Sequence, residues 1–283
     1  MMSGVGILRR LIAGVVKWSL LALVLLWAAF PIVFMVMSSF KRPSEIWAYP
    51  PRLWGSIMTM TNYEQILQFS PNYYRALWNS VQVTVIGVIL TILVSIAAAF
   101  VFSRIRTGWL KLPGLLIIVI RMFPPIVVII PLFPLMSALG LLDTITPLVL
   151  AGTAFSVSIA TMLLKAFIDD IPAELEQSAM IDGCNQFQAF ILITLPLIAP
   201  GIAAVVVFVA VGFWNEYLFA LVFTSTEART APVAIAVAIS DPDGARWGQL
   251  LAMSTIQLAP VLLLVMLVHK QLVQGMTTGA VKG

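Results

Sequence analysis

The chain has 283 residues, of which 61% are hydrophobic and only 10% are charged. A soluble domain carries about a quarter charged residues, so this composition excludes a soluble protein and indicates a membrane protein. The net charge is +4, but the chain has no basic stripe interleaved with aromatic residues, which argues against nucleic-acid binding. The single cysteine, Cys184, excludes an intrachain disulfide.

Long apolar segments predict an all-α membrane protein with six transmembrane helices. A spanning helix needs about 20 mostly apolar residues, because lipid offers the backbone no hydrogen-bond partners. The first segment is charge-free from Trp18 to Phe40, which is too long for a signal-peptide core and indicates an uncleaved span. The chain, 1–283, is expected to be one transmembrane domain with spans at about 16–38, 80–103, 113–136, 145–166, 197–222 and 249–269.

The distribution of Lys and Arg predicts that both termini are cytoplasmic. In that orientation nine basic residues lie on the cytoplasmic side and six on the outer side, with Arg121 in the membrane. The short loop from Arg104 to Lys111 carries three of the nine. Trp and Tyr residues between positions 47 and 78 then flank the first two spans on the outer side, as an interfacial belt does.

The third and fifth spans contain residues that are unusual at membrane depth. Burial of an ionisable side chain there costs at least ~2.5 kcal/mol on insertion scales, so such residues often line or gate a pathway. A structural role, in which the charge pairs with another helix or with water, is an equal alternative. Prolines at 124, 125 and 131 are expected to interrupt the third helix, either as a broken helix that lines a cavity or as a kink. The candidate pathway or gate residues are Arg121, Pro124, Pro125, Asn215 and Glu216.

The loop between the fourth and fifth spans, residues 169–196, is predicted to form two short helices. Pro172 suits the first position of the first helix, and Glu174 and Glu176 favour the positive end of its dipole. Gly183 is expected to end this helix in a left-handed conformation. Ser178 and Ala179 are small, so another surface could approach the backbone closely. This suits a helix seated in a partner's cleft, with a helix resting on lipid headgroups as the alternative.

The second loop helix is predicted to begin at a capping box made by Asn185 and Gln188. A period of three to four residues places four of its side chains on one face. These are Phe187, Phe190, Ile191 and Thr194. Pro196 is expected to separate this helix from the membrane span.

The spacing of this loop resembles the EAA loop of bacterial ABC importer permeases. That family has Glu-Ala-Ala, three residues, Gly, nine residues and Ile-x-Leu-Pro. Here Gly183 and Ile193-Thr194-Leu195-Pro196 match, while the leading triplet falls on Gln177-Ser178-Ala179 and lacks the glutamate, for which Glu176 is a substitute. Three further segments resemble the maltose-permease-type carbohydrate subfamily: Arg121-Met122-Phe123-Pro124-Pro125, Trp214-Asn215-Glu216 and the tail Gly279–Gly283.

The resemblance implies a carbohydrate importer permease of a bacterial inner membrane. Its implied partners are a second homologous permease, two ATPase subunits, an extracytoplasmic solute-binding protein and membrane lipid, with no nucleic acid. This chain has no Walker-type loop, so ATP and magnesium are expected on the ATPases, and no cofactor or metal on this chain. The implied ATPase-coupling residues are Glu174, Glu176, Gln177, Ser178, Ala179, Asp182, Gly183, Ile193, Leu195 and Pro196.

The last outer loop, about residues 223–248, is the implied contact for the binding protein, with Asp241, Asp243 and Gly244 in its turn. Three alternatives remain beside this interpretation. A secondary transporter acting alone is disfavoured because the chain shows no paired halves. A membrane enzyme is disfavoured because one His and one Cys supply neither a nucleophile–base pair nor a metal cluster. An ABC importer for a solute other than a carbohydrate is the third.

Overall fold

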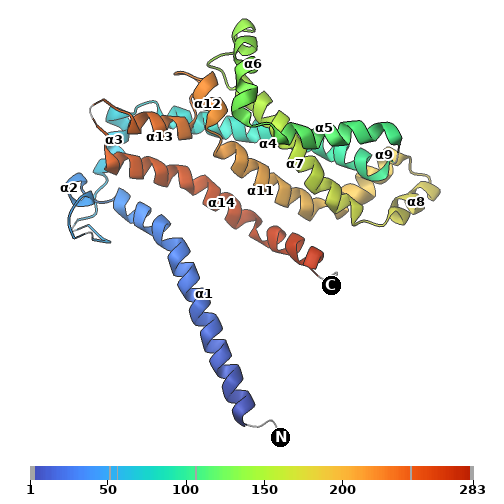
Figure 1. Cartoon of the computed structure of the whole chain (residues 1–283), viewed down its shortest axis with the longest axis horizontal. Helices are drawn as coiled ribbons and strands as arrows, with labels where there is room; N and C mark the ends of the chain where they lie inside the picture. Colours follow the sequence, from blue (N-terminus) through green and yellow to red (C-terminus); the bar gives the residue numbers. More distant parts are fainter. Residues whose placement is uncertain (1–3, 51, 56, 106, 243, 281–283) are drawn as a thin grey trace. The chain divides into compact units, whose positions relative to one another are not determined.

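The computed structural model describes residues 4–50, 52–55, 57–105, 107–242 and 244–280, and over these residues all regular structure is helical (Figure 1). The chain divides into two compact units. Unit 1 contains the residues up to Pro71 and Ala238–Ile256, and unit 2 contains Asn72–Val237 and the residues from Gln257 onward. Within the described residues, four helices are long and apolar enough to cross a membrane unbroken: α1 (Gly4–Ser39), α4 (Tyr73–Arg104), α7 (Thr146–Asp169) and α14 (Trp247–Ala280).

Two bent helix pairs bring the number of spans to six if each pair is counted as one. The first pair joins α5 (Lys111–Met122) to α6 (Pro125–Ala138) at an angle of 98°. The break falls where predicted, because Pro124 has no N–H to continue α5 and Pro125 occupies the first position of α6. Pro131 lies inside α6, which continues past it, so a break is excluded there and the alternative of a kink remains. Neighbouring groups can compensate for the missing hydrogen bond in membrane helices.

The second bent pair corresponds to the predicted fifth span. Residues Gln186–Leu197 meet α11 (Ala199–Trp214) at 73°, so the bend lies at Ile198, two residues after Pro196. The span was expected to continue to residue 222, but α11 ends at Trp214 and α12 (Leu218–Phe223) is a separate short helix. The separation has a local cause: the Glu216 carboxylate accepts hydrogen bonds from the N–H groups of Phe219 and Ala220, at 2.8 and 3.1 Å, and so starts a new helix.

The core of unit 2 is formed by α4, α7 and α11, which lie side by side in Figure 1. Phe213 of α11 sits between two glycines, Gly87 of α4 and Gly152 of α7. A Cβ atom at either glycine would lie 2.4 or 2.3 Å from the Phe213 ring. Small residues therefore permit the close approach of three helices, as is common in membrane bundles. The C-terminal ends of α4 and α7 meet, where the Ser103 hydroxyl donates to Asp169 at 2.6 Å.

Unit 1 is organised around the buried side chain of Asn62 in α3 (Thr61–Phe69). Its amide donates to the carbonyl groups of Ser39 and Lys41, both at 2.7 Å, and thereby joins α3 to the end of α1. Gly248 packs on the same side chain, since a Cβ there would lie 2.2 Å from Asn62 Oδ1. This unit also contains the four-residue helix α2 (Pro43–Ile46). The helix α13 (Ala231–Ile239) crosses the sequence boundary between the units.

Candidate functional site

The first helix of the predicted coupling loop is α8 (Ala173–Ile181), which lies with α9 (Gln186–Ala189) at one end of unit 2 (Figure 1). Pro172 is its N-cap, one position earlier than expected, because its ψ of 127° is extended and not yet helical. Gly183 has a φ of +101° and ends the helix as predicted. The N–H groups of Gly183 and Cys184 donate to the carbonyl groups of Met180 and Ala179, at 3.2 and 3.0 Å, which is a Schellman motif.

The second loop helix begins at the predicted capping box. The Gln188 N–H donates to Asn185 Oδ1 at 2.9 Å, and the Asn185 N–H donates to Gln188 Oε1 at 2.8 Å. A π-helical turn, Phe190–Thr194, and the short α10 (Leu195–Leu197) then lead to the bend. The face predicted for this helix is unevenly covered, because Thr194 is fully buried whereas Phe187 is 68% exposed. The π turn also widens the helical period within the segment.

The predicted coupling residues divide between two faces of the loop. Ala179 and Glu176 are buried, whereas Ser178 and Gly183, the other small residues of the predicted docking face, are exposed. The surface also presents apolar side chains at the tip of the loop, with Ile181 86% exposed and Phe187, Met180 and Leu175 beside it in the sequence. The other predicted coupling residues are exposed or half-buried. The exposed ones are Glu174, Gln177, Ser178, Asp182, Gly183 and Pro196, and the half-buried ones are Ile193 and Leu195.

Glu176 was suggested as a substitute for the missing glutamate of the motif, in an outward ionic contact. The structure places it inside the molecule, where it pairs with Arg104 at the end of α4. Arg104 Nε lies 2.9 and 3.1 Å from the two carboxylate oxygens, and Nη2 lies 2.9 Å from Oε1. The Thr194 hydroxyl donates to Glu176 Oε1 at 2.7 Å, and Arg104 Nη2 donates to the carbonyl of Ile171 at 3.0 Å.

Arg121, a predicted pathway residue, lines a cavity of about 630 Å³ between α7 and α11. The other lining residues include Ser156, Phe208 and Gly212, and most of the lining is apolar. Among the residues that the structure describes, Arg121 has no hydrogen-bond or ion-pair partner. Pro124 and Pro125 follow it at the break between α5 and α6. Of the predicted pathway residues, Arg121 lines this cavity, whereas Asn215 and Glu216 are not among its lining residues.

Asn215 and Glu216 have local structural roles in the part of unit 2 around α12. Asn215 Nδ2 donates to the Val211 carbonyl at 2.9 Å at the end of α11. Glu216 caps α12 through the two backbone hydrogen bonds described above. Of the two interpretations weighed for Glu216, these contacts favour the structural one.

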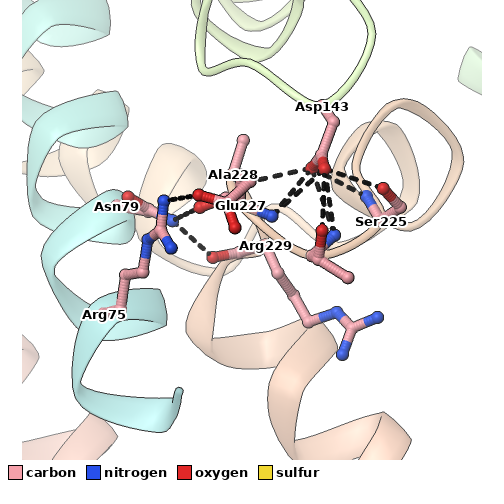
Figure 2. A network of polar contacts seen from close by, with 8 residues as sticks. Arg75, Asn79, Asp143, Ser225, Glu227, Ala228 and Arg229 are labelled. Atoms are coloured by element: carbon pink, nitrogen blue, oxygen red, sulfur yellow. Dashed lines mark hydrogen bonds and ion pairs between the residues drawn. The ribbon is translucent and has the colours of Figure 1, made fainter.

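At the end of unit 2 opposite α8, Asp143 binds the loop between α12 and α13 (Figure 2). Its carboxylate accepts hydrogen bonds from four successive backbone N–H groups, those of residues 225–228, at 3.0 to 3.2 Å. The hydroxyls of Ser225 and Thr226 donate to it as well, at 2.7 and 3.1 Å. Asp143 itself has a φ of +56°, a left-handed conformation that Asp tolerates better than most residues.

This arrangement controls the ionisation of Asp143. Its burial alone would raise the pKa, but the hydrogen bonds from Ser225, Ala228 and Glu227 lower the pKa of the carboxyl well below its usual range. Hydrogen bonds to the charged form have this effect because protonation would remove acceptors. Asp143 is therefore an anion held by a backbone nest.

Helix α4 holds the same loop from a second side (Figure 2). Asn79 Nδ2 donates to the carbonyl groups of Glu227 and Arg229 at 2.8 and 3.0 Å. Arg75 forms an ion pair with Glu227, and the Ala231 N–H donates to the Ser80 hydroxyl at 2.9 Å. We call the loop 224–231 with these contacts and Asp143 the clasp. Sequence reasoning missed it, although the Asp before a turn at 143 and the Ser-Thr run at 224–226 were visible signals.

The turn proposed for binding-protein contact lies in unit 1. Asp241 forms an ion pair with Arg246 at 2.8 Å, and the Gly244 N–H donates to the Asp241 carbonyl at 2.9 Å. Gly244 has a φ of +93°, so the expected turn is present. Asp243 lies outside the described residues. Within the described residues, no group of three or more His, Cys, Asp or Glu side chains is arranged to hold a metal ion.

Comparisons with known proteins agree on one family. Residues 91–278 match the family described as binding-protein-dependent transport system inner membrane component. The sulfoquinovosyl glycerol transport system permease protein SmoH of Agrobacterium fabrum is 34% identical over 255 residues, covering 90% of this chain and 89% of that protein. The trehalose transport system permease protein SugB of Mycobacterium tuberculosis is 34% identical over 269 residues, covering 94% and 97%.

The fold also matches a solved structure. A chain of a bacterial ABC transporter involved in the import of the acidic polysaccharide alginate aligns with a TM-score of 0.77 at 22% identity, over 93% of this chain and 97% of that chain. More than half of the chain matches the family, and relatives above 30% identity cover nearly all of it. The chain belongs to the family of inner membrane components of binding-protein-dependent transport systems.

Proposed function

We propose that this chain is a permease subunit of an ATP-driven importer that moves a carbohydrate or carbohydrate-like solute across a bacterial inner membrane. The family is that of binding-protein-dependent transport components. Relatives across nearly the whole chain are named for sulfoquinovosyl glycerol, trehalose and diacetylchitobiose transport, which supports a carbohydrate. The bent pairs α5–α6 and Gln186–α11 would each be one of six spans.

The observation that carries the proposal is the exposed apolar tip of the loop 169–196. Ile181 is 86% and Phe187 68% exposed on two short helices at one end of unit 2. Large apolar side chains exposed on a capped, ordered element mark a site of protein contact, because water solvates them poorly. We assign this tip to the groove of a partner ATPase, which would bind ATP and magnesium. A second homologous permease and a second ATPase would complete the membrane assembly.

The proposed orientation follows from this assignment. The α8 end of unit 2 would face the cytoplasm, as would both termini, and the clasp would face outward. The loop from residue 223 to 248, with α13 and the turn at Asp241 and Gly244, would then be available to a solute-binding protein. A solved alginate importer in complex with a periplasmic protein that carries an alginate pentasaccharide has the same fold, with a TM-score of 0.67.

The test is to express the chain together with its partner permease and ATPase subunits, then purify it and measure uptake. The ATPase subunits are expected to co-purify, and Gly183→Leu is expected to abolish ATPase coupling and uptake while leaving membrane insertion intact. At a φ of +101° a branched side chain is strained even though the space around it is open. Normal uptake by this variant would contradict the docking assignment.

Gly183→Asn is the matched control, since Asn tolerates the left-handed conformation and preserves the Schellman motif. It is expected to retain most of the uptake. A chain that transports without any ATPase would contradict the proposed function as a whole.

A further inference from the structure

The buried pair of Arg104 and Glu176 links the predicted coupling loop to the end of α4. Glu176 is only 7% exposed, although it belongs to a helix whose neighbouring residues Glu174 and Gln177 face solvent. Its carboxylate receives three contacts from the Arg104 guanidinium within 3.1 Å and one from the Thr194 hydroxyl at 2.7 Å. A carboxylate with these partners is not available to another protein.

The contacts of this pair join four segments of the chain. Arg104 ends α4, Glu176 lies on α8, Thr194 lies on the π turn, and the Ile171 carbonyl that accepts from Arg104 precedes α8. A second contact reinforces the link, because the rings of Phe100 of α4 and Phe190 of the π turn lie 4.5 Å apart. Both halves of the loop are therefore attached to the same helix.

We infer that the Arg104–Glu176 pair transmits movement of the coupling loop to α4, so that both are positioning residues for transport. Charge-assisted hydrogen bonds shielded from water are strong and geometrically restrictive, so the loop and the end of α4 move together. This inference rests on the proposed function, since it takes α8 as the element that docks on the ATPase.

Helix α4 can carry this movement to the opposite end of unit 2. It is one unbroken helix of 32 residues without an internal proline. From Arg104 to Asn79 it spans roughly 38 Å at 1.5 Å per residue. At that far end Asn79 and Ser80 hold the backbone of residues 227, 229 and 231. The ATPase side and the clasp are thus connected through one rigid element, which is the kind of physical link that coupling between distant sites requires.

The test uses the full importer, with its partner permease, ATPases and binding protein, reconstituted in liposomes. Glu176→Gln keeps the shape but removes the charge. We expect the purified complex to retain its ATPase subunits, while the ratio of binding-protein-stimulated to basal ATPase activity falls about tenfold, within the usual range for coupling between sites. The double variant Arg104→Glu with Glu176→Arg is expected to recover part of this ratio. Glu64→Gln, an exposed carboxyl on α3, is the charge-matched control.

Two results would overturn the inference. One is a normal stimulation ratio in Glu176→Gln. The other is loss of the ATPase subunits from an intact permease pair, which would make Glu176 a docking residue. If the complex with Glu176→Gln fails to assemble, Thr194→Val tests the inference in its place. This variant keeps the ion pair and is expected to lower the stimulation ratio about threefold. An unchanged ratio would overturn the inference. A wild-type complex without any stimulation would instead refute the proposed function.

Discussion

Single polar side chains hold the ends of unit 2 together, and Asp143 is the most heavily bonded of them. One carboxylate accepts from the N–H groups of four successive residues and from two hydroxyls. A loop of this kind would otherwise leave several donors without partners. Asp143 therefore fixes the conformation of the segment that leads into α13.

Asp143→Asn is expected to destabilise the protein by about 1–3 kcal/mol, because the neutral amide accepts fewer hydrogen bonds and presents its own N–H groups to donors. The loss should appear as a lower unfolding midpoint in detergent. Thr226→Val, which removes a single hydroxyl donor, should have a smaller effect. An Asn variant as stable as the wild type would show that the clasp contributes nothing to stability.

The difference in stability between wild type and Asp143→Asn depends on pH in a direction that the pKa shift fixes. The pKa of Asp143 is lower in the folded protein than in the unfolded chain. Its stabilising contribution is therefore complete above the ordinary Asp range, at about pH 4, and is lost as the pH falls through the folded-state pKa. The difference in the free energy of unfolding between wild type and Asp143→Asn should be constant near neutral pH and should narrow progressively as the pH falls below about 4.

At the scale of elements, α13 combines a buried start with an exposed end. Ala231 and Val233 are buried in unit 2, whereas Val237 and Ile239 are 44% and 50% exposed. Removing the whole loop would therefore damage the core as well as the surface. The exposed end of α13, close to the turn at Asp241, is the part suited to contact a binding protein.

Replacing both Val237 and Ile239 with Asp is expected to weaken stimulation by the binding protein roughly tenfold, as the loss of about 1–2 kcal/mol at an interface does. Co-purification of the partner subunits should be unchanged. The control is Leu67→Asp, an exposed apolar residue on α3. The measurement is ATPase activity as a function of binding-protein concentration. An unchanged titration curve would show that α13 is a passive connector.

At the scale of the whole molecule, the cavity predicted to belong to the pathway is lined by residues from more than one helix. The cavity of about 630 Å³ is lined by residues of α7 and α11, with Arg121 of α5. An ionisable side chain at membrane depth is costly, and such residues commonly mark a transport pathway. Arg121 without a partner among the described residues fits that description.

Arg121→Gln is expected to lower solute uptake about tenfold in proteoliposomes, because the guanidinium would no longer contribute charge to the pathway. Arg121→Lys should retain part of the uptake, since it keeps the charge but not the planar fork of donors. Assembly with the ATPases is the accompanying measurement. Full uptake by Arg121→Gln would assign this residue to packing or lipid contact.

Much of the local structure followed from the sequence because it depends on neighbouring residues. The capping box at Asn185, the stop at Gly183 and the break at Pro124 were each predicted from residues within one helical turn, and each is present. The long apolar segments likewise predicted the continuous spans, since the requirement for about 20 apolar residues is a property of the bilayer. The family was suggested by the resemblance of the loop 169–196 to the EAA motif, and not by composition or local chemistry.

Only the tertiary structure decided which way side chains face and which distant residues meet. Glu176 looks like a surface carboxylate in the sequence, but Arg104, 72 positions earlier, pairs with it inside the bundle. Asp143 finds its donors more than 80 positions later. The burial of Ala179 also depends on packing between segments of the folded chain. Hydropathy depends only on which residues follow one another along the chain. The partner of a buried charge depends on which hydrogen-bonding groups the fold brings next to it, because buried polar groups need partners.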